Sequence, residues 1–585
     1  MILSYGMTNI EIAKILRKVA AAYTILNESR FRIIAYENAA TAIEHLTSEL
    51  KDLWDDNKLQ EVPTIGTSII THLNELFEKG RVAYWEQTFK KVPSAVFPLL
   101  DIPGIGPKTA YKLVVHLKLD NENKAIEYLK KAADEHLISS IAGFGDRSEK
   151  EIVESVKLYE KGLVKENRLN INQADEIASQ IISYLRNGEI LGSLRRRVAT
   201  IGDIDLAVPT DKPLEVISSF LNYPLATEVI EKGPTGASIR LTNGRQVDLR
   251  VVEPSRWGSM LQYFTGSKYH NIKLREYALK KGLSLSEYGI KKVKTETIEK
   301  FENEKEFYNY LGLDYILPEL REDGGEIEAA SRHQLPELVK LSDVKGDLQM
   351  HSSFAQNTSH DSGLSSIKEL QLKAKSLGYE YIGITDHNPS TKNHTKDQLI
   401  EELKKRSEEF ERLNKSNNNP RVINLLEVDI QPNGDLPLPD KALEYLEAFL
   451  VSIHSEFRMT RDEMTDRVIK GLSHPKAKIL AHPTGRLLGK REGFELNWDK
   501  IFEFCLKNDK VVEINCYPDR LDLPDTLVRE AVKKGVKLSL GTDSHIADDL
   551  TNMKYGLDVA RRGWAQKSDI INTWSYNKMI KWIRG

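Results

Sequence analysis

Residues 192–208 read GSLRRRVATIGDIDLAV, a segment that combines three consecutive arginines with two aspartates spaced two positions apart. Its second half alternates apolar and polar residues, which predicts a half-buried β-strand. On a strand, Asp203 and Asp205 would project to the same face, where two carboxylates repel each other unless a cation lies between them. Carboxylate oxygens are suitable ligands for Mg²⁺. The alternative is a solvent-facing aspartate pair on an edge strand.

The residues around this strand favour the metal site. The preceding GSLRR supplies a turn of small residues with exposed N–H groups, a hydroxyl and guanidinium groups, all of which suit phosphate oxygens. The later stretch RQVDLRVV, residues 245–252, alternates in the same way and offers Asp248 as a third carboxylate if the two strands pair. Three carboxylates beside a phosphate-binding turn predict nucleotidyl transfer with divalent metal ions.

These motifs carry a resemblance to a known family. The turn GS-x-RR, the strand GDID and the later VDL strand resemble the catalytic palm of X-family DNA polymerases, the family that includes polymerase beta. Similar turns with paired aspartates also occur in other nucleotidyltransferases, and the stretch YFTGSKYHNIKLREYAL at residues 263–279 narrows the choice. That stretch resembles the segment of X-family polymerases that faces the nascent base pair.

The resemblance implies roles for individual residues. Asp203, Asp205 and Asp248 are the expected catalytic residues, and they would hold Mg²⁺ or Mn²⁺. Arg275 would contact the template strand. The residues expected to bind the incoming dNTP are Gly192, Ser193, Arg196, Gly202, Tyr263, Phe264, Gly266 and Asn271. A template-independent transferase is a weaker alternative, because Asn271 and Arg275 match positions that serve a templated base pair.

The predominantly helical first part of the chain carries a DNA-binding pattern. IPGIGPKTA at residues 102–110 is typical of a helix-hairpin-helix motif. In such a motif, Gly104 and Gly106 let backbone N–H groups approach a phosphate at a helix N-terminus, and Lys108 adds positive charge. An ordinary Gly-Pro turn between helices is the alternative. Contacts of this kind bind DNA without reading its sequence.

Two further stretches resemble this motif. VPTIGTSII at residues 62–70 is a weaker first copy that keeps Gly66 but has Thr64 in place of a glycine. IAGFGDRSE at residues 141–149 is a third copy. We therefore expect several sequence-independent phosphate contacts along one DNA duplex.

Residues 8–80 resemble the small N-terminal domain of polymerase beta, which also removes a deoxyribose-phosphate through a lysine Schiff base. The matching position here is His72, and a neighbouring phosphate-binding lysine position is Ser68. Imidazole cannot form this Schiff base as a primary amine does. We therefore do not expect deoxyribose-phosphate lyase activity, although binding of a 5′-phosphate could survive through other groups.

After residue 343, β-like runs alternate with helical segments, which predicts βα units around a parallel sheet, either open or closed into a barrel. A side chain that can bind a metal ion (histidine, glutamate or aspartate) follows most of these runs. A single histidine after a strand is more often a capping or core residue, but the same placement recurs from unit to unit. Histidine and carboxylate without cysteine suit Zn²⁺ or Mn²⁺. The candidate ligands are His351, His387, Glu427, His454, His482, Asp543 and His545.

This set resembles the polymerase-and-histidinol-phosphatase (PHP) domain, a seven-fold β/α barrel with a trinuclear metal site. Bacterial and archaeal X-family polymerases carry it at the C-terminus, typically as a Mn²⁺-dependent 3′–5′ exonuclease. Two departures matter here. Gln349 replaces the first histidine of the usual His-x-His, and its amide oxygen would be a weaker ligand. The following loop, residues 352–363, is long, and Asp361 (or His360) is the substitute for the next ligand.

Composition sets outer limits. The chain has 585 residues, is 40% hydrophobic and carries a formal net charge of −3, so a DNA-binding surface must be a local patch. It contains no apolar run of about 18 residues and no pattern typical of a secretory signal. Its two cysteines, Cys505 and Cys516, are too few for a disulfide framework. We expect a cytoplasmic monomer that does not associate with membranes.

The expected fold class is a multidomain combination of α+β and α/β parts. The expected domains are a helical DNA-binding domain (1–85), a helix-hairpin-helix domain (86–165), a nucleotidyltransferase palm (166–252), a thumb-like subdomain (253–317), a linker (318–342) and a PHP domain (343–585).

The favoured function is template-directed filling of short gaps in DNA with dNTPs, acting on gapped or primer-template DNA, with an appended 3′–5′ exonuclease. One alternative keeps the polymerase and makes the PHP domain a non-catalytic scaffold. Another is a DNA-binding protein whose barrel hydrolyses small phosphate esters.

Overall fold

The computed structural model describes residues 7, 9–44, 50, 54, 59–62, 65–102, 104–141, 143–145, 148–150, 152–153, 155–156, 168–354, 358–392, 394–415 and 420–585. The chain divides into two compact units, Met1–Glu166 and Asn167–Gly585. Across these described stretches, no helix has both the length and the apolar character needed to cross a membrane.

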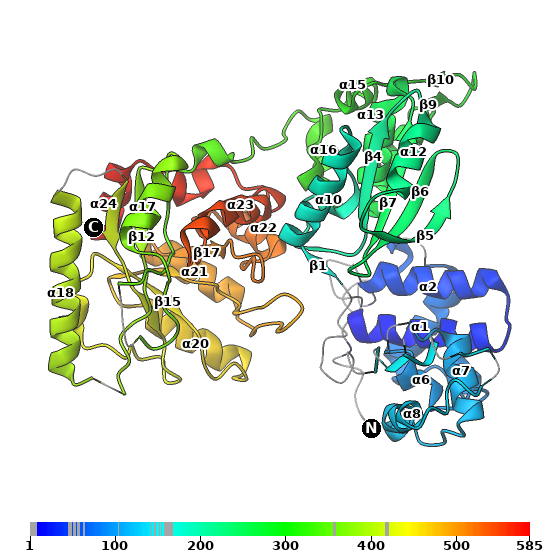
Figure 1. Cartoon of the computed structure of the whole chain (residues 1–585), viewed down its shortest axis with the longest axis horizontal. Coiled ribbons are helices and arrows are strands. Elements are labelled where there is room, and N and C mark those ends of the chain that lie inside the picture. The colour runs from blue at the N-terminus through cyan, green and yellow to red at the C-terminus, as the bar shows by residue number, and fades with distance from the viewer. Residues whose placement is uncertain are drawn as a thin grey trace. The chain divides into compact units, whose positions relative to one another are not determined.

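The first unit is helical, as its sequence periodicity predicts (Figure 1). Two hydrophobic clusters form its interior, one around Leu16 and Leu73 and the other around Leu99 and Leu113. Its described α-helices are α1 (Asn9–Ile25), α2 (Arg30–Glu44), α4 (Thr67–Lys79), α5 (Ala83–Phe89), α6 (Val96–Leu99), α7 (Pro107–His116) and α8 (Ala125–Asp134).

Glycines lie at the helix ends in the hairpins of this unit. Helices α4 and α7 both begin directly after an extended glycine, Gly66 and Gly106, and α7 has Pro107 at its first position, where no N–H is needed for an intrahelical bond. Helix α4 ends at Gly80, which has φ +69° and donates its N–H to the carbonyl of Leu76. The turns are therefore determined by local sequence.

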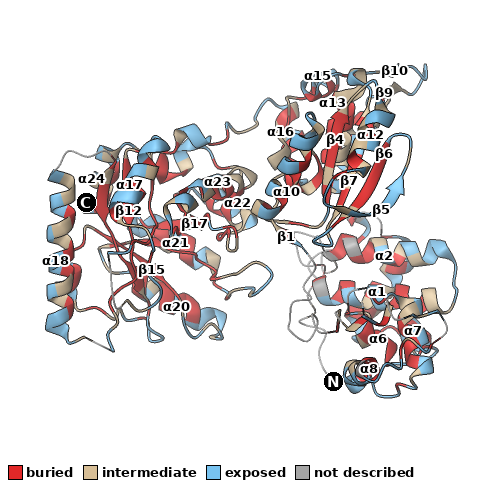
Figure 2. Cartoon of the chain, viewed as in Figure 1, coloured by how far each residue is buried: buried red, intermediate tan, exposed pale blue. Residues whose placement is uncertain are grey.

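A five-stranded mixed sheet forms the first part of the second unit. Its order is β2-β4-β7-β6-β5, with β4 and β7 parallel and the other neighbours antiparallel. Helix α10 (Ile171–Leu185) packs against β4, and α12 (Pro213–Leu221) against β6 and β7. Figure 2 shows β4, β6 and β7 buried and the edge strand β5 exposed. The strands are β2 (Glu189–Ile190), β4 (Ile204–Pro209), β5 (Ala226–Lys232), β6 (Gly236–Leu241) and β7 (Gln246–Val252).

The next part pairs helices with a small antiparallel sheet of order β10-β9-β8. The stretch expected as a linker, 318–342, departs from that expectation, because Leu320, Ile327 and Ala330 pack into the hydrophobic cluster of this part. It contains α16 (Glu326–Ser331) and two short 3₁₀ turns. The other elements are α13 (Trp257–Thr265), α14 (Lys268–Leu279), β8 (Leu283–Ser286), β9 (Gly289–Lys292), β10 (Ile298–Glu299) and α15 (Glu304–Tyr310).

The C-terminal part contains parallel strands followed by helices, as expected. The strands form two sheets, β11-β12-β13 and β14-β15-β16-β17-β18, joined by single bridge pairs between His387 and Glu427 and between Met350 and Ser544. Closure into a seven-fold barrel stays a prediction. The strands are β11 (Gly346–Asp347), β12 (Tyr381–Ile384), β13 (Arg421–Asn424), β14 (Glu427–Asp429), β15 (Phe449–Ser452), β16 (Ala477–Leu480), β17 (Val511–Asn515) and β18 (Leu538–Gly541).

Helices surround these strands. Every residue of β12, β15 and β18 is buried, so both faces of these strands are covered, as is typical of parallel sheets packed between helices. The main helices are α17 (Ile367–Ser376), α18 (Lys396–Lys415), α20 (Arg461–Leu472), α21 (Trp498–Asn508), α22 (Asp525–Lys534), α23 (Met553–Arg562) and α24 (Tyr576–Arg584).

Candidate active sites

Three carboxylates meet at β4 and β7. The parallel register of these strands places Asp205 opposite Asp248. Asp203 lies in the bend just before β4, so it precedes the strand that was expected to include it. A side chain on Gly192, the first residue of the short helix α11 (Gly192–Arg195), would collide with the carboxylate of Asp205. The α11 backbone therefore lies directly against this carboxylate.

The electrostatics of this site call for a cation. Burial, followed by the nearby Asp248 and Asp203, raises the pKa of Asp205 to about 6. Asp248 is held by Ser238 Oγ and by Gln246 Nε2, which lies 3.1 and 3.2 Å from its two carboxylate oxygens. Oxygen donors clustered in this way fit a divalent ion such as Mg²⁺.

The three consecutive arginines have three different sets of partners. Arg195 reaches Glu304 through two nitrogens at 3.0 and 2.7 Å, and Arg197 reaches Asp175 at 2.7 and 2.8 Å. Arg196 donates to the carbonyl of Thr265 at 2.6 Å and to Glu322 at 2.9 Å. Arg195 and Arg197 are therefore occupied by structural ion pairs.

The segment after α13 gathers the other predicted nucleotide-binding residues. Tyr263 and Phe264 occupy the last turn of α13, which ends at Gly266 with φ +69°. Asn271 donates to the Tyr263 carbonyl at 2.7 Å, and the Arg275 guanidinium lies 6.0 Å from the centre of the Tyr263 ring. These residues form one contiguous surface beside the Arg196 guanidinium, which lies close to Gly266.

Phe264 connects this surface to the carboxylate strands, because its ring lies 5.3 Å from the guanidinium of Arg250 on β7. Ser193 lies in α11 next to Gly192. Gly202 precedes Asp203, and a side chain there would meet Arg168. The structure thus brings the predicted palm residues together around one region.

Glu427 is the centre of the second cluster. It is fully buried, and its carboxylate lies 2.8 Å from His482 Nε2, 3.4 Å from His454 Nε2 and 3.4 Å from His351 Nε2. His351 Nε2 also lies 3.1 Å from Asp543. Burial alone would lower the pKa of His351, but Asp543 and Glu427 outweigh it and raise the pKa to about 10.

Asp361 occupies the other side of this cluster. Its two oxygens lie 3.2 Å from His387 Nε2 and 3.2 Å from His545 Nε2. These two imidazoles flank that of His351, with ring centres 4.6 and 4.5 Å from it. The other loop residue proposed from the sequence also reaches the cluster: the His360 ring centre lies 4.4 Å from that of His454, and His360 forms one candidate metal group with Asp429 and His454.

The donor set of this cluster fits divalent metal ions. Buried imidazole nitrogens on His351 and His482 (Nδ1 in each) lack a hydrogen-bond partner in the described structure, and four groups of three ligand atoms lie within 4.8 Å of one another. Neighbouring imidazoles would repel one another if all were protonated. Neutral imidazoles can instead bind metal ions through their free nitrogens. Histidine and carboxylate donors suit Mn²⁺ or Zn²⁺.

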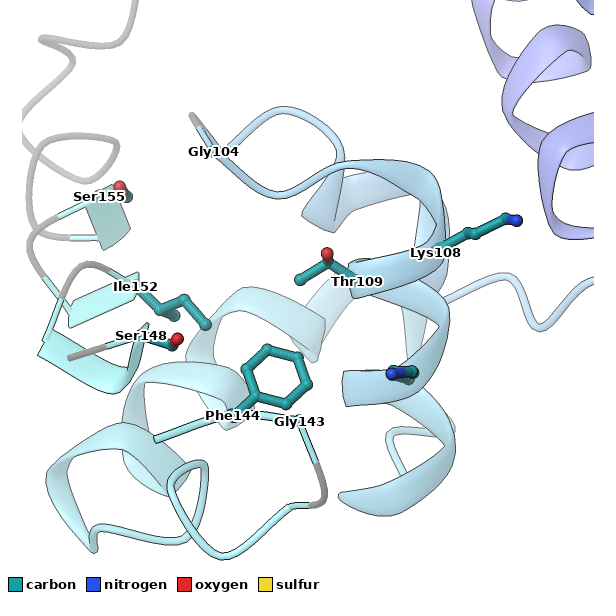
Figure 3. A pocket seen from close by; sticks show the side chains of 9 residues that line it. Gly104, Lys108, Thr109, Gly143, Phe144, Ser148, Ile152 and Ser155 are labelled. Carbon is teal, nitrogen blue, oxygen red and sulfur yellow. The ribbon is translucent and has the colours of Figure 1, made fainter. Parts of the chain in front are cut away.

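The hairpins of the first unit frame a pocket of about 300 Å³. Figure 3 shows Thr109 and Phe144 facing the pocket from the second and third motifs, while Lys108 points away from it. Side chains added at Gly66, Gly104, Gly106 or Gly145 would meet no atom within 4 Å. All three motifs therefore have open space in front of a glycine, although Thr64 lies outside the described residues.

Comparison with known proteins identifies the family. Over 582 residues, or 98% of this chain and 99% of the relative, the sequence is 34% identical to the DNA polymerase/3′-5′ exonuclease PolX of Bacillus subtilis. The chain is an X-family DNA polymerase. Residues 260–322 match the family profile of the DNA polymerase beta thumb, 7–82 a helix-hairpin-helix domain and 97–157 a SAM-like helix-hairpin-helix tandem.

Other relatives of this X-family chain are named as probable phosphatases. A probable phosphatase of Acetivibrio thermocellus is 28% identical over 31% of this chain and 74% of that protein. Another from Thermoanaerobacter sp. is 23% identical over 36% of the chain and 84% of that protein. Their lengths correspond to one domain of the chain.

Two residues of the cluster around Glu427 were not predicted from the sequence: Asp429 and Asn515. Asp429 accepts hydrogen bonds from His454 Nδ1 at 2.7 Å and His360 Nε2 at 3.0 Å. It thereby holds the His454 ring with Nε2 toward Glu427, a common role for a carboxylate behind a metal-ligating histidine. The signal was present in the stretch LEVDI, because Glu427 and Asp429 have the same two-residue spacing that drew attention to the palm aspartates.

Asn515 was not predicted either, and its side chain contacts that of Gln349. Asn515 Nδ2 lies 3.3 Å from Gln349 Oε1 and 3.1 Å from Asp543 Oδ2. Gln349 Nε2 in turn donates to Glu427 at 3.0 Å. The amide oxygen proposed as a weak metal ligand is thus bonded to Asn515, and the amide N–H faces Glu427.

His72 lies in an aromatic environment. Its Nδ1 is 2.7 Å from the Tyr36 hydroxyl, and its ring stacks on Tyr84 with centres 5.4 Å apart. Burial lowers the pKa of His72, which favours the neutral form. Ser68 is exposed nearby. No primary amine stands at either position.

Proposed function

We propose that the chain is a template-directed DNA polymerase that fills short gaps, with its catalytic carboxylates at Asp203, Asp205 and Asp248. The observation that carries this proposal is the parallel register of Asp205 and Asp248 with α11 packed against them. Mg²⁺ or Mn²⁺ bound there supplies charge neutralisation and a more acidic primer 3′-hydroxyl. Asp203, Asp205 and Asp248 are the residues that would hold these ions.

The neighbouring residues bind and orient the substrates. The backbone at Gly192 and Gly202, with Ser193 and Arg196, binds the triphosphate of a dNTP. For this, Arg196 exchanges its bond with Glu322 for phosphate oxygens, which are stronger partners for a guanidinium fork. The remaining contacts are Tyr263, Phe264 and Gly266 to the sugar, Asn271 to the incoming base and Arg275 to the template.

The second cluster carries out 3′–5′ exonucleolytic hydrolysis. The residues that would hold Mn²⁺ or Zn²⁺ are His351, Asp361, His387, Glu427, His454, His482, Asp543 and His545, and the ions would supply Lewis acidity that activates water at neutral pH. Asp429 holds a proton on His454 Nδ1 and keeps Nε2 available. The paired activities in the name of the Bacillus subtilis relative support this assignment.

DNA is held by the hairpins without sequence preference, and the chain acts as a monomer on gapped or primer-template DNA. The alternative of a non-catalytic PHP scaffold has one observation in its favour. Gln349 directs an N–H toward Glu427, where the family has a second imidazole.

A pair of substitutions tests both sites at once. Asp205→Ala should reduce primer extension on gapped DNA by more than about 1,000-fold, because two metal ions lose a ligand, and should leave 3′ digestion unchanged. His482→Ala should do the reverse. Extension is followed with dNTPs and Mg²⁺, and digestion with Mn²⁺ and no dNTPs.

Extension that survives Asp205→Ala would refute the palm assignment. If the wild-type chain extends primers but shows no digestion, the scaffold alternative holds. Digestion that is unaffected by His482→Ala would remove the second cluster from the hydrolytic chemistry.

A further inference from the structure

One guanidinium reaches the second metal cluster without being a metal ligand. Arg520 lies in the loop after β17, and its Nε is 3.4 Å from Asp543 Oδ2. The Arg520 side chain is 18% exposed and that of Asp543 is 9% exposed, so the pair lies at the mouth of the cluster. Arg520 therefore connects the ligands to the solvent from which DNA arrives.

The loop backbone holds this side chain in place. The Arg520 N–H donates to the Tyr517 carbonyl at 2.8 Å, and its own carbonyl accepts from Arg486 Nε at 2.9 Å. Arg486 also donates to the carbonyl of Leu521. Arg520 is thus presented from a backbone clamped on both sides, which limits the entropy that its guanidinium would lose on binding an anion.

Charge indicates what kind of ligand Arg520 serves. Asp543 already has His351 at 3.1 Å and Asn515 at 3.1 Å, and it is a predicted ligand of a divalent ion. Once its carboxylate is shared with a metal, the guanidinium faces a cluster of cations and needs another anion close by. Arg491 adds to this excess, since burial and then the neighbouring Arg520 lower the pKa of Arg491.

A phosphodiester is the anion that the proposed exonuclease reaction brings to this cluster. The planar guanidinium can donate two parallel N–H bonds to two phosphate oxygens, a geometry that lysine cannot match. We propose that Arg520 binds the non-bridging oxygens of the scissile phosphodiester in the exonuclease site. This inference rests on the proposed placement of the exonuclease at the cluster.

The test uses the full-length chain with Arg520→Ala and Arg520→Lys. Kinetics are measured with Mn²⁺ on a single-stranded oligonucleotide and on bis(p-nitrophenyl) phosphate, a small diester that lacks all other DNA contacts. For Arg520→Ala, kcat/KM should fall about 10- to 100-fold on both substrates, largely through KM, as expected for loss of a charged hydrogen bond. Arg520→Lys should recover part of the loss.

Two further measurements separate binding from structure. The number and affinity of Mn²⁺ ions bound without substrate should be the same in Arg520→Ala and wild type, as should primer extension. Arg584→Ala is the matched control, because Arg584 pairs with Glu447 at 2.8 Å on an exposed surface of the same domain. It should leave both kinetic constants unchanged.

The proposal is overturned if Arg520→Ala binds fewer Mn²⁺ ions, which would make Arg520 a structural neighbour of Asp543. It is also overturned if only oligonucleotide digestion declines, which would place Arg520 on a different phosphate. His482→Ala, measured in parallel, distinguishes failure of the Arg520 proposal from failure of the proposed exonuclease site. Loss of digestion there with normal kinetics in Arg520→Ala refutes only the role of Arg520, whereas unchanged digestion in His482→Ala refutes the site itself.

Discussion

Glu304 shows how one residue can determine the integrity of the region around the nucleotide site. Its carboxylate is buried and lies 2.6 Å from the fully buried Arg321 and 2.7 Å from Arg195, and Tyr315 donates to it at 3.1 Å. Burial alone would raise the pKa of Glu304, but the two arginines outweigh it and lower the pKa to about 2. Two cations, the fully buried Arg321 and the partly buried Arg195, are therefore neutralised by one carboxylate.

This depressed pKa predicts acid sensitivity. The ionised carboxylate stabilises the fold fully above the ordinary glutamate pKa of about 4.5, and this stabilisation is lost as pH falls toward about 2. Glu304→Gln should cost about 3–5 kcal/mol at pH 7, because it removes the carboxylate that neutralises the buried Arg321 guanidinium. Urea unfolding of both proteins between pH 7 and pH 3 measures the two effects.

The exposed Glu306 on the same helix provides the control, and Glu306→Gln should change the stability little. A Glu304→Gln protein that is as stable as wild type at pH 7, or that keeps the full acid dependence, would contradict this account.

At the scale of single elements, the start of α7 offers a position where a substitution can affect phosphate binding without affecting the packing of the fold. Gly106 precedes this helix with φ −78°, so an alanine can adopt its backbone conformation, and a side chain there would meet no atom within 4 Å. Gly104, by contrast, has φ +77° and requires glycine for its conformation. Gly106 is therefore the position where a methyl group intrudes on a bound phosphate without disturbing the fold.

Gly106→Ala should weaken binding of gapped DNA about 3- to 10-fold, as expected for loss of one phosphate contact, and should leave the melting temperature almost unchanged. Fluorescence anisotropy at low salt measures the affinity. Gly233→Ala, whose side chain would lie 3.6 Å from the nearest atom in a hairpin of the palm sheet, is the control. Equal affinities for the Gly106→Ala and Gly233→Ala proteins would argue against phosphate binding at α7.

At the scale of the second unit, the polymerase and phosphoesterase parts are fastened together. Palm and C-terminal residues share one hydrophobic cluster. Arg197 joins Asp175 of α10 to Asp558 of α23 at 2.7 Å, and Arg562 of α23 donates to the Arg196 carbonyl at 2.8 Å. Glu322 is shared between Arg196 and Arg562, at 2.9 Å from each. The segment 192–197 is thus joined directly to the domain that carries the second cluster.

These links predict joint unfolding of the two parts. The wild-type second unit should unfold in one calorimetric transition. Arg197→Ala combined with Arg562→Ala should split it into two, because partly buried carboxylates lose their charged partners at about 1–3 kcal/mol for each broken pair. Arg240→Ala, which breaks a surface pair with Glu228, is the control. An unsplit transition at the wild-type temperature would show that the apolar contacts alone join the parts.

The sequence alone determined the features that depend on neighbouring residues. The spacing of Asp203 and Asp205, the glycines of the hairpins and the recurrence of histidines after apolar runs all express geometry within a few residues of chain. They predicted a metal-dependent nucleotidyl-transfer site, a phosphate-binding hairpin and a second metal site, and the resemblance carried by the same motifs implied the family and the two activities. Local backbone geometry, with its fixed periods, makes such patterns readable without a structure.

Tertiary structure decided the choices among partners distant in the chain. Three adjacent arginines looked alike in sequence, yet Arg197 pairs with Asp558, which lies 361 positions away. Asp361 faces His387 and His545, His360 pairs with Asp429, and Asn515 engages Gln349. Burial of Arg321 and Glu326 also converted most of an expected linker into folded structure. Such pairings follow from which elements the whole fold brings together, and no local period encodes them.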